Sequence, residues 1–211
     1  SLALDAQRNV HIVWQDGRNG MYIVNYYKKL DANGNVLVND LALTFNDTLP
    51  QDLAPPALTI DGQGNVHIAW TDCRDGDCEI YYKKLDSNGN EMISDTRITS
   101  NVELSWFPDV NINNDNVNIM WVDGRNGNLE IYYSRLDNNG NILESEQRIT
   151  FDNADSALPA LANNVRFVWV DKRDGNEEIY YKGVSSPGDP NGDGVVNDAD
   201  LDLIREAIIT G

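Results

Sequence analysis

A run near the end of the chain carries oxygen-bearing side chains at the spacing of a calcium loop. From Asp189 to Asp200, carboxylate or amide oxygens fall at loop positions 1, 3, 5, 9 and 12. Gly194 at position 6 permits the sharp turn, and position 7 offers a backbone carbonyl. Ca²⁺ is a hard cation that prefers such oxygen ligands. The spacing predicts a Ca²⁺ site with ligands Asp189, Asn191, Asp193, Val195, Asn197 and Asp200.

Apolar residues follow this loop at helical spacing, at Leu201, Ile204 and Ile208. They predict a short helix with one apolar face. The other interpretation is a solvated acidic tail, because from Pro187 onward the chain carries six acidic residues and only Arg205 as a base.

A second polar pattern, Trp-x-Asp-x-Arg, occurs four times. An Asp and an Arg two residues apart point to one face of an extended strand, so they can bind each other or cap the following turn. We favour a repeated ion pair that fixes a turn, because the pattern recurs in every copy; the alternative is four equivalent ligand sites. The residues are Asp16, Arg18, Asp72, Arg74, Asp123, Arg125, Asp171 and Arg173.

Hydrolysis requires an asymmetric pair of groups, which identical repeats do not provide. Residues that occur once, such as Glu103, Trp106, Asp109 and Glu177, could provide it, but their spacing does not indicate that they do. The sequence therefore names no catalytic residue.

Histidine and cysteine each occur twice. His11 and His67 occupy one repeat position that is Asn or Arg in the other copies, so we interpret them as ordinary strand residues. Cys73 and Cys78 flank the turn of the second copy, which predicts a disulfide and an oxidising compartment. Free thiols or a weak metal site are the alternative.

The elements that position these groups follow from the repeat, which has a tryptophan about every fifty residues, at Trp14, Trp70, Trp121 and Trp169. In the second copy, apolar residues alternate with others from 66 to 71, and a β-branched and aromatic run spans 79 to 85, so both segments are predicted strands. A Pro-led segment before them and a segment ending in Arg97-Ile98-Thr99 complete four strands.

Asn-Gly at positions 88 and 89 predicts a type I′ hairpin turn after the third strand of this unit. The fold class predicted is therefore all-β, a β-propeller of four-stranded blades with the tryptophans as core filler between blades rather than ligand platforms. A small helical, EF-hand-like segment follows it.

Four sets of three inner strands are present, but only three outer strands. We therefore expect an incomplete ring: either a piece of a longer propeller, or a chain whose last blade is completed by another molecule through self-association. The predicted divisions are 1–184 for the propeller repeats, 185–188 for a linker and 189–211 for the calcium-binding segment.

The 211 residues carry a formal net charge of -18, with 41% hydrophobic residues. Such a chain folds, and it repels nucleic acid and anionic membranes, so neither is an expected partner. No apolar stretch has the length of a membrane span and no charged-then-apolar leader opens the sequence, so we expect a mature or trimmed product without membrane insertion. Cations and neutral ligands such as glycans are the favoured partners.

The segment from Gly188 to Gly211 resembles a single dockerin-type repeat. The resemblance implies Ca²⁺ binding and docking onto a cohesin-like protein of a secreted or cell-surface assembly. The preceding repeats resemble those of secreted sialidase-like propellers, and Thr59-Ile60-Asp61-Gly62 partly matches the Asp-box of the BNR type. This second resemblance implies the architecture only.

The expected function is a secreted or cell-surface binding or assembly module, with a glycan or protein ligand and a calcium-dependent docking segment. On this interpretation the chain is not an enzyme. The alternatives are a glycoside hydrolase or sialidase-like enzyme of an extracellular complex, and a structural subunit of an extracellular layer or filament.

Overall fold

The structure is a computed structural model that describes residues 1–18, 23–44, 54–162 and 166–183. The predicted linker, calcium loop and helix lie outside the described residues, so the domain divisions remain predictions. The part of the chain that the structure describes is built from strands, and it includes no helix long and apolar enough to cross a membrane.

The strands form four antiparallel sheets in chain order, three of four strands and a last one of three. The first sheet is β1-β2-β3-β4, the second β5-β6-β7-β8, the third β9-β10-β11-β12 and the fourth β13-β14-β15. Each sheet is one blade, and we number the blades 1 to 4. The strand bounds are β1 Leu2–Leu4, β2 Val10–Asp16, β3 Val24–Leu30, β4 Val36–Ala42, β5 Ala57–Ile60, β6 Val66–Asp72, β7 Glu79–Leu85, β8 Glu91–Arg97, β9 Ser105–Asn113, β10 Asn116–Asp123, β11 Glu130–Leu136, β12 Ile142–Arg148, β13 Ser156–Ala162, β14 Arg166–Asp171 and β15 Glu178–Gly183.

The sequence pattern forms these strands because each blade packs on a neighbour. In blade 2 every residue of the two middle strands, β6 and β7, is buried, whereas the outer strand β8 is largely exposed. β-branched and aromatic side chains fill such a pleated, buried surface well. The predicted all-β fold of four-stranded blades is confirmed by this arrangement.

The hydrophobic core lies between blades rather than inside one. One cluster joins blades 2 and 3, with Trp121 of β10 packed beside Ile80 and Tyr82 of β7. Trp70 and Trp169 occupy the equivalent places between blades 1 and 2 and between blades 3 and 4. Each tryptophan also stacks on a tyrosine of its own blade, as Trp121 does on Tyr132 at 6.1 Å. Trp70, Trp121 and Trp169 therefore act as core, whereas the equivalent residue of blade 1, Trp14, is half-buried and lies outside these three clusters.

The turn between the third and fourth strands differs from the predicted type I′ turn. Of the two central residues of this turn in blade 2, Asn88 and Gly89, only Gly89 has a positive φ, of 86°. The Asp86 carboxylate accepts the backbone N–H groups of Asn88 and Asn90 at 2.8 and 2.9 Å. A type I′ turn needs positive φ at both central residues. The aspartate supplies hydrogen bonds that favour a longer turn, and Asp31 and Asp137 do the same in blades 1 and 3.

A buried lysine of one blade reaches this turn in the next blade. Lys29 of β3 donates to the carbonyl of Ser87 at 3.0 Å, and Lys84 of β7 donates to the carbonyl of Asn138 at 3.1 Å. We call these two contacts the lysine latches. They fix the relative position of successive blades.

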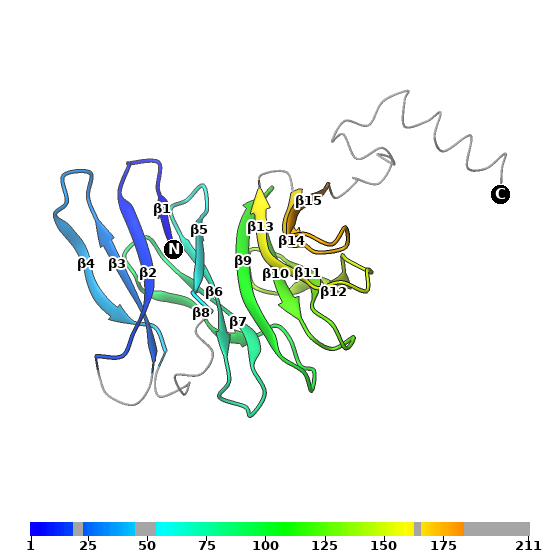
Figure 1. The fold of residues 1–211 in the computed structure, drawn as a ribbon. Helices are drawn as coiled ribbons and strands as arrows, with labels where there is room; N and C mark the ends of the chain where they lie inside the picture. The colour runs from blue at the N-terminus through cyan, green and yellow to red at the C-terminus, as the bar shows by residue number, and fades with distance from the viewer. Residues whose placement is uncertain (19–22, 45–53, 163–165, 184–211) are drawn as a thin grey trace, which may run out of the picture.

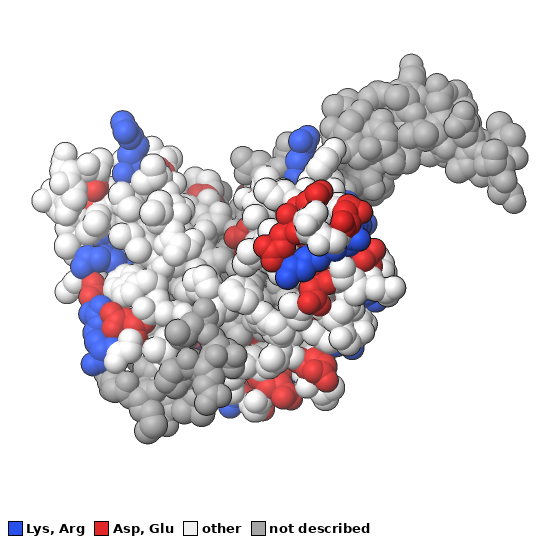
Figure 2. Space-filling model, viewed as in Figure 1, with Lys and Arg blue, Asp and Glu red and all other residues white. Residues whose placement is uncertain are grey.

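The described blades form an open arc (Figure 1). β1 contacts β5, β5 contacts β9 and β9 contacts β13, while blade 1 and blade 4 lie at opposite ends of the row in Figure 1. Large apolar side chains are exposed at both ends: Leu2 and Leu4 are 68% and 59% exposed, and Ile179 and Tyr181 are 78% and 77% exposed. At the end of the arc where β12, β14 and β15 lie, acidic and basic side chains are gathered on the surface (Figure 2).

Candidate functional site

The predicted Asp-Arg pairs hold the turn after the second strand of each blade. In blade 2, Trp70 Nε1 donates to Asp72 Oδ2 at 3.0 Å, and the Arg74 backbone N–H donates to Asp72 Oδ1 at 3.0 Å. The Arg74 guanidinium contacts the same carboxylate at 2.5 Å. Equivalent contacts join Asp16 with Arg18, Asp123 with Arg125 and Asp171 with Arg173.

The arginines of these pairs also contact other residues of their blades. Arg125 lies over the Tyr132 ring at 4.4 Å and forms an ion pair with Glu146 of the outer strand. In blade 1, hydrogen bonds from Arg18 hold the pKa of Asp16 at about 2. Because each Asp and Arg is already held by its partner in the same turn, we assign the eight residues to blade structure and not to ligand binding.

Both histidines belong to buried hydrogen-bond chains, a feature that sequence reasoning missed. In blade 2, His67 Nδ1 lies 2.8 Å from the Tyr82 hydroxyl and Nε2 lies 3.2 Å from Asp61 Oδ2. In blade 1, His11 stands between Asp5 and Tyr27 in the same way. The common spacing of Asp six residues before His, with Tyr fifteen or sixteen after it, was the available signal. Blade 3 closes the chain with Asn118 and Tyr133 instead.

Stability is expected to fall as the pH drops from 6.5 to about 4. Burial lowers the pKa of His67 from 6.5 to about 4, although the Asp61 contact opposes the shift. The unfolded chain therefore binds more protons than the folded chain in this window. The neutral, buried His67 contributes on the order of 3 kcal/mol to the free energy of unfolding above pH 6.5, and this contribution is lost as the pH falls to about 4. The variant His67→Asn, which copies blade 3, should show a smaller loss when urea unfolding is compared at the two pH values. An unchanged pH dependence would contradict this account.

Asp109 breaks the symmetry of the innermost strands. It lies on β9 opposite Met120, at the register position that Ala57 occupies on β5 and Ala160 on β13. Its Oδ2 accepts the backbone N–H of Leu161 at 2.6 Å and its Oδ1 accepts that of Val110 at 3.0 Å. Burial raises the pKa of Asp109, and these backbone hydrogen bonds offset only part of the shift. The result is a carboxyl group that holds its proton more strongly than usual.

Phe107 and Pro108, the two residues before Asp109, line a hollow between the inner strands, and Asp109 itself is not among its lining residues. A cavity of about 200 Å³ is lined by Pro55, Phe107, Pro108, Leu158 and Pro159. Phe107 and Leu158 have positive φ values of 53° and 49°, and the register of β9 and β13 shifts beside them. Bulky residues are strained in this conformation, and such strain clusters at functional sites. This hollow and Asp109 form the candidate site.

The other residues that occur once lie elsewhere. Glu103 is exposed before β9, Trp106 is half-buried in the core between blades 3 and 4, and Glu177 is exposed and paired with Lys172 at 3.1 Å.

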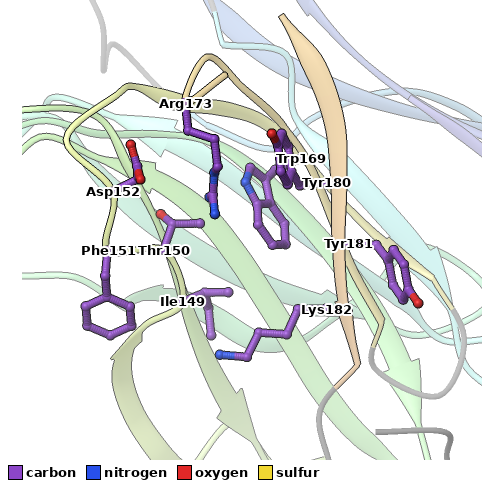
Figure 3. Close-up of a pocket in the computed structure, with 9 residues that line it drawn as sticks. All are labelled: Ile149, Thr150, Phe151, Asp152, Trp169, Arg173, Tyr180, Tyr181 and Lys182. Atoms are coloured by element: carbon purple, nitrogen blue, oxygen red, sulfur yellow. The ribbon is translucent and has the colours of Figure 1, made fainter. Parts of the chain in front are cut away.

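A second cavity of about 410 Å³ lies along β15 (Figure 3). Arg173, Trp169 and Tyr180 line one side of it, and Tyr181 points to the opposite side of the strand (Figure 3). The cavity continues to the segment after β12, which includes Ile149 and Phe151.

Cys73 and Cys78 form a disulfide across the turn between β6 and β7. The six predicted calcium ligands lie outside the described residues. Within residues 1–183, where described, no group of three or more His, Cys, Asp or Glu could hold a metal ion.

No protein-family model matches the chain, and no curated protein matches it. Solved structures do. The α-L-arabinanase of Penicillium chrysogenum, complexed with arabinobiose, superimposes with a TM-score of 0.58 at 13% identity, over 88% of this chain and 62% of that one. The GH43 endo-arabinanase of Bacillus licheniformis gives 0.54 at 13%, over 90% and 73%. The chain has a β-propeller fold.

TolB of Acinetobacter baumannii also shares this propeller fold, with a TM-score of 0.54 at 19% identity over 88% of this chain. The propeller of this chain spans 41% of that protein, and likewise 41% of a GH43_12 protein from a capybara gut metagenome. The sialidase-like resemblance is confirmed as far as this fold and no further.

The expectation that the chain is not an enzyme is corrected by these propellers. It rested on the symmetry of the repeats, but arabinanases are built on the same scaffold. Repetition of the blade is therefore compatible with glycoside hydrolysis. A single departure in one blade, such as Asp109 among alanines, is enough to make an inner strand chemically distinct.

Proposed function

We propose that the chain is the propeller of a glycoside hydrolase that acts on a neutral polysaccharide of the arabinan type. The observation that carries the proposal is Asp109, a carboxyl group with a raised pKa on an innermost strand. The arabinanase propellers described above support the reaction class.

The proposed role of Asp109 is that of the general acid. Glycoside hydrolysis needs one carboxylic acid that remains protonated, to give its proton to the leaving oxygen, and a second carboxylate that activates water or forms a covalent intermediate. The environment of Asp109 favours the first role, because the protonated form is the one that burial stabilises. The proposal assigns the general acid and names no residue for the second carboxylate.

The hollow lined by Phe107 and Pro108, which precede Asp109 on the chain, suits a neutral sugar. Its lining by Phe107, Leu158 and three prolines offers apolar surface to the faces of a sugar ring. The net charge of -18 would repel an anionic polysaccharide.

The proposal is tested by incubating the chain with linear arabinan, a neutral xylan and the anionic polygalacturonate, and measuring the release of reducing ends. Release is expected from arabinan and not from polygalacturonate. Binding to arabinan on affinity gels without release would instead favour the binding module expected from the sequence. Neither release nor binding with any neutral polysaccharide would end the proposal.

The C-terminal segment is proposed to bind one Ca²⁺. In calorimetric titration the wild-type chain should bind about one equivalent, because the predicted ligands supply a full oxygen set. Asp193→Ala removes a predicted ligand and should abolish this binding, whereas Asp202→Ala, outside the ligand positions, should not. Wild-type chain that binds no Ca²⁺ at millimolar concentration would refute the site.

The dockerin resemblance supports two further proposals: that this segment attaches the propeller to a cohesin-like extracellular partner, and that the chain works outside the cell. The Cys73–Cys78 disulfide accords with the second, since disulfides persist in oxidising compartments.

A further inference from the structure

Blade 4 has the residues that receive an outer strand, and no strand pairs with its edge among the described residues. In blades 2 and 3 a glutamate begins the third strand and is fully buried, Glu79 in β7 and Glu130 in β11. The outer strand covers it. The equivalent residue of blade 4, Glu178 at the start of β15, is exposed.

The three complete blades show how an outer strand is recognised. In blade 3, Arg148 forms an ion pair with Glu130 at 2.5 Å and lies opposite Tyr132. Thr150 Oγ1 accepts the Ile131 N–H at 2.9 Å and donates to Glu130. Blade 2 repeats every one of these contacts with Arg97, Thr99, Glu79, Tyr81 and Ile80.

Two further contacts recur. The residue before the threonine donates its backbone N–H to the third strand at 2.8 Å in all three blades, from Leu43, Ile98 and Ile149. An acid two positions before the arginine position meets the arginine of the turn, as Asp95 meets Arg74 at 2.8 Å. The outer-strand pattern is thus acid-x-Arg-aliphatic-Thr, with alanine in place of Arg in blade 1.

Blade 4 carries the residues that, in the other blades, contact the outer strand. Arg173, which is bound to Asp171, corresponds to Arg74 and lines the 410 Å³ cavity together with Tyr180 and Lys182 of β15 (Figure 3). Lys182 is exposed, whereas its counterpart in blade 2, Lys83, is buried and paired with outer-strand acids, Asp95 at 2.8 Å and Glu91 at 3.0 Å. The edge therefore offers a cation for an incoming acid and Glu178 for an incoming arginine.

We infer that the edge of β15 and the adjoining cavity bind an extended strand of a separate polypeptide that carries acid-x-Arg-aliphatic-Thr. The strand adds antiparallel to β15, with its arginine opposite Tyr180 and its threonine on the Ile179 N–H. The aliphatic residue then lies beside the exposed Ile179. A separate polypeptide is taken as the source because the complete pattern occurs in these 211 residues only at 95–99 and 146–150, and the outer strands β8 and β12 that carry it are paired within their own blades.

A labelled peptide with the sequence of residues 142–151 of this chain tests the inference, since it carries the complete pattern. Titrated with the full chain and followed by fluorescence anisotropy, it should bind saturably and slow amide hydrogen exchange along β15. Glu178→Gln in the chain should weaken binding about tenfold, as should replacement of the peptide arginine by alanine, because each removes one charge-assisted hydrogen-bonded pair. The matched control Glu177→Gln alters an exposed glutamate that pairs with Lys172, and it should leave the affinity unchanged.

Three results would overturn the inference. They are the absence of saturable binding at millimolar peptide, equal weakening by Glu177→Gln and Glu178→Gln, and protection from exchange on strands other than β15.

Discussion

Replacing Arg148 with alanine is expected to lower the free energy of unfolding of the chain by about 3 to 5 kcal/mol. Glu130 is fully buried, and Arg148 is the cation that pairs with it, at 2.5 Å. Without that cation the Glu130 carboxylate stays in the interior with only Thr150 and the Asn128 amide, at 3.0 Å, as partners. An unpaired buried charge is among the most destabilising defects a folded chain can carry. Urea unfolding followed by tryptophan fluorescence measures the change.

Two comparison variants isolate the cause. Adding Glu130→Gln to the Arg148→Ala variant should recover part of the loss, because a neutral amide needs no cation. Glu178→Ala alters the equivalent residue of blade 4, which is exposed, and should change stability by less than about 0.5 kcal/mol. Equal losses from Arg148→Ala and Glu178→Ala would show that the outer strand does not create the effect.

Replacing Asp109 with asparagine is expected to reduce the rate of polysaccharide hydrolysis by about 10²- to 10⁴-fold, the usual contribution of a general acid. The amide cannot give a proton to the leaving oxygen. The wild-type rate should also decline on the alkaline side of its pH profile as the raised pKa of Asp109 is passed, because the acid is then ionised. Reducing-end release from arabinan at several pH values measures both effects.

The structural contribution of Asp109 has to be separated from its chemical one, because its oxygens join β9 to β13 through Leu161. Asp109→Glu keeps a carboxyl group and should retain more activity than Asp109→Asn, while the thermal unfolding of both variants shows whether the blades remain joined. Glu103→Gln, at an exposed position, serves as the control with unchanged activity. A fully active Asp109→Asn variant would remove this residue from the mechanism.

The blades were predictable because their information is local. Alternation from Val66 to Thr71 marks β6 to within one residue of its end at Asp72, and the run from Glu79 to Leu85 marks β7 at the bounds the structure gives. The same applies to the tryptophans, since a large aromatic residue at one position of every repeat has to fill the space between sheets. A repeat of about fifty residues in the sequence therefore predicts a repeat of blades in the structure.

The candidate site was predicted only in part, because its contacts join distant positions. Asp109 was recognisable as a residue without counterparts, but its bond to Leu161, 52 residues away, depends on how β9 and β13 meet. The positive φ of Phe107 and Leu158 likewise follows from register shifts against the next strand. The Asp86 turn was mistaken because the carboxylate of the first residue outweighs the preference of Asn-Gly.

The lysine latches bear on how such a chain can evolve. Lys29 and Lys84 each bind a backbone carbonyl of the blade that follows, and each is held by an aspartate of its own blade, Asp5 at 3.3 Å and Asp61 at 3.8 Å. An in-frame duplication of blade 1 or blade 2 would therefore create a new junction that already has its lysine and its acceptor. The number of blades can change in a single genetic event without compensating substitutions at the junctions, so lineages of this protein are expected to differ by whole repeats rather than by fragments of one.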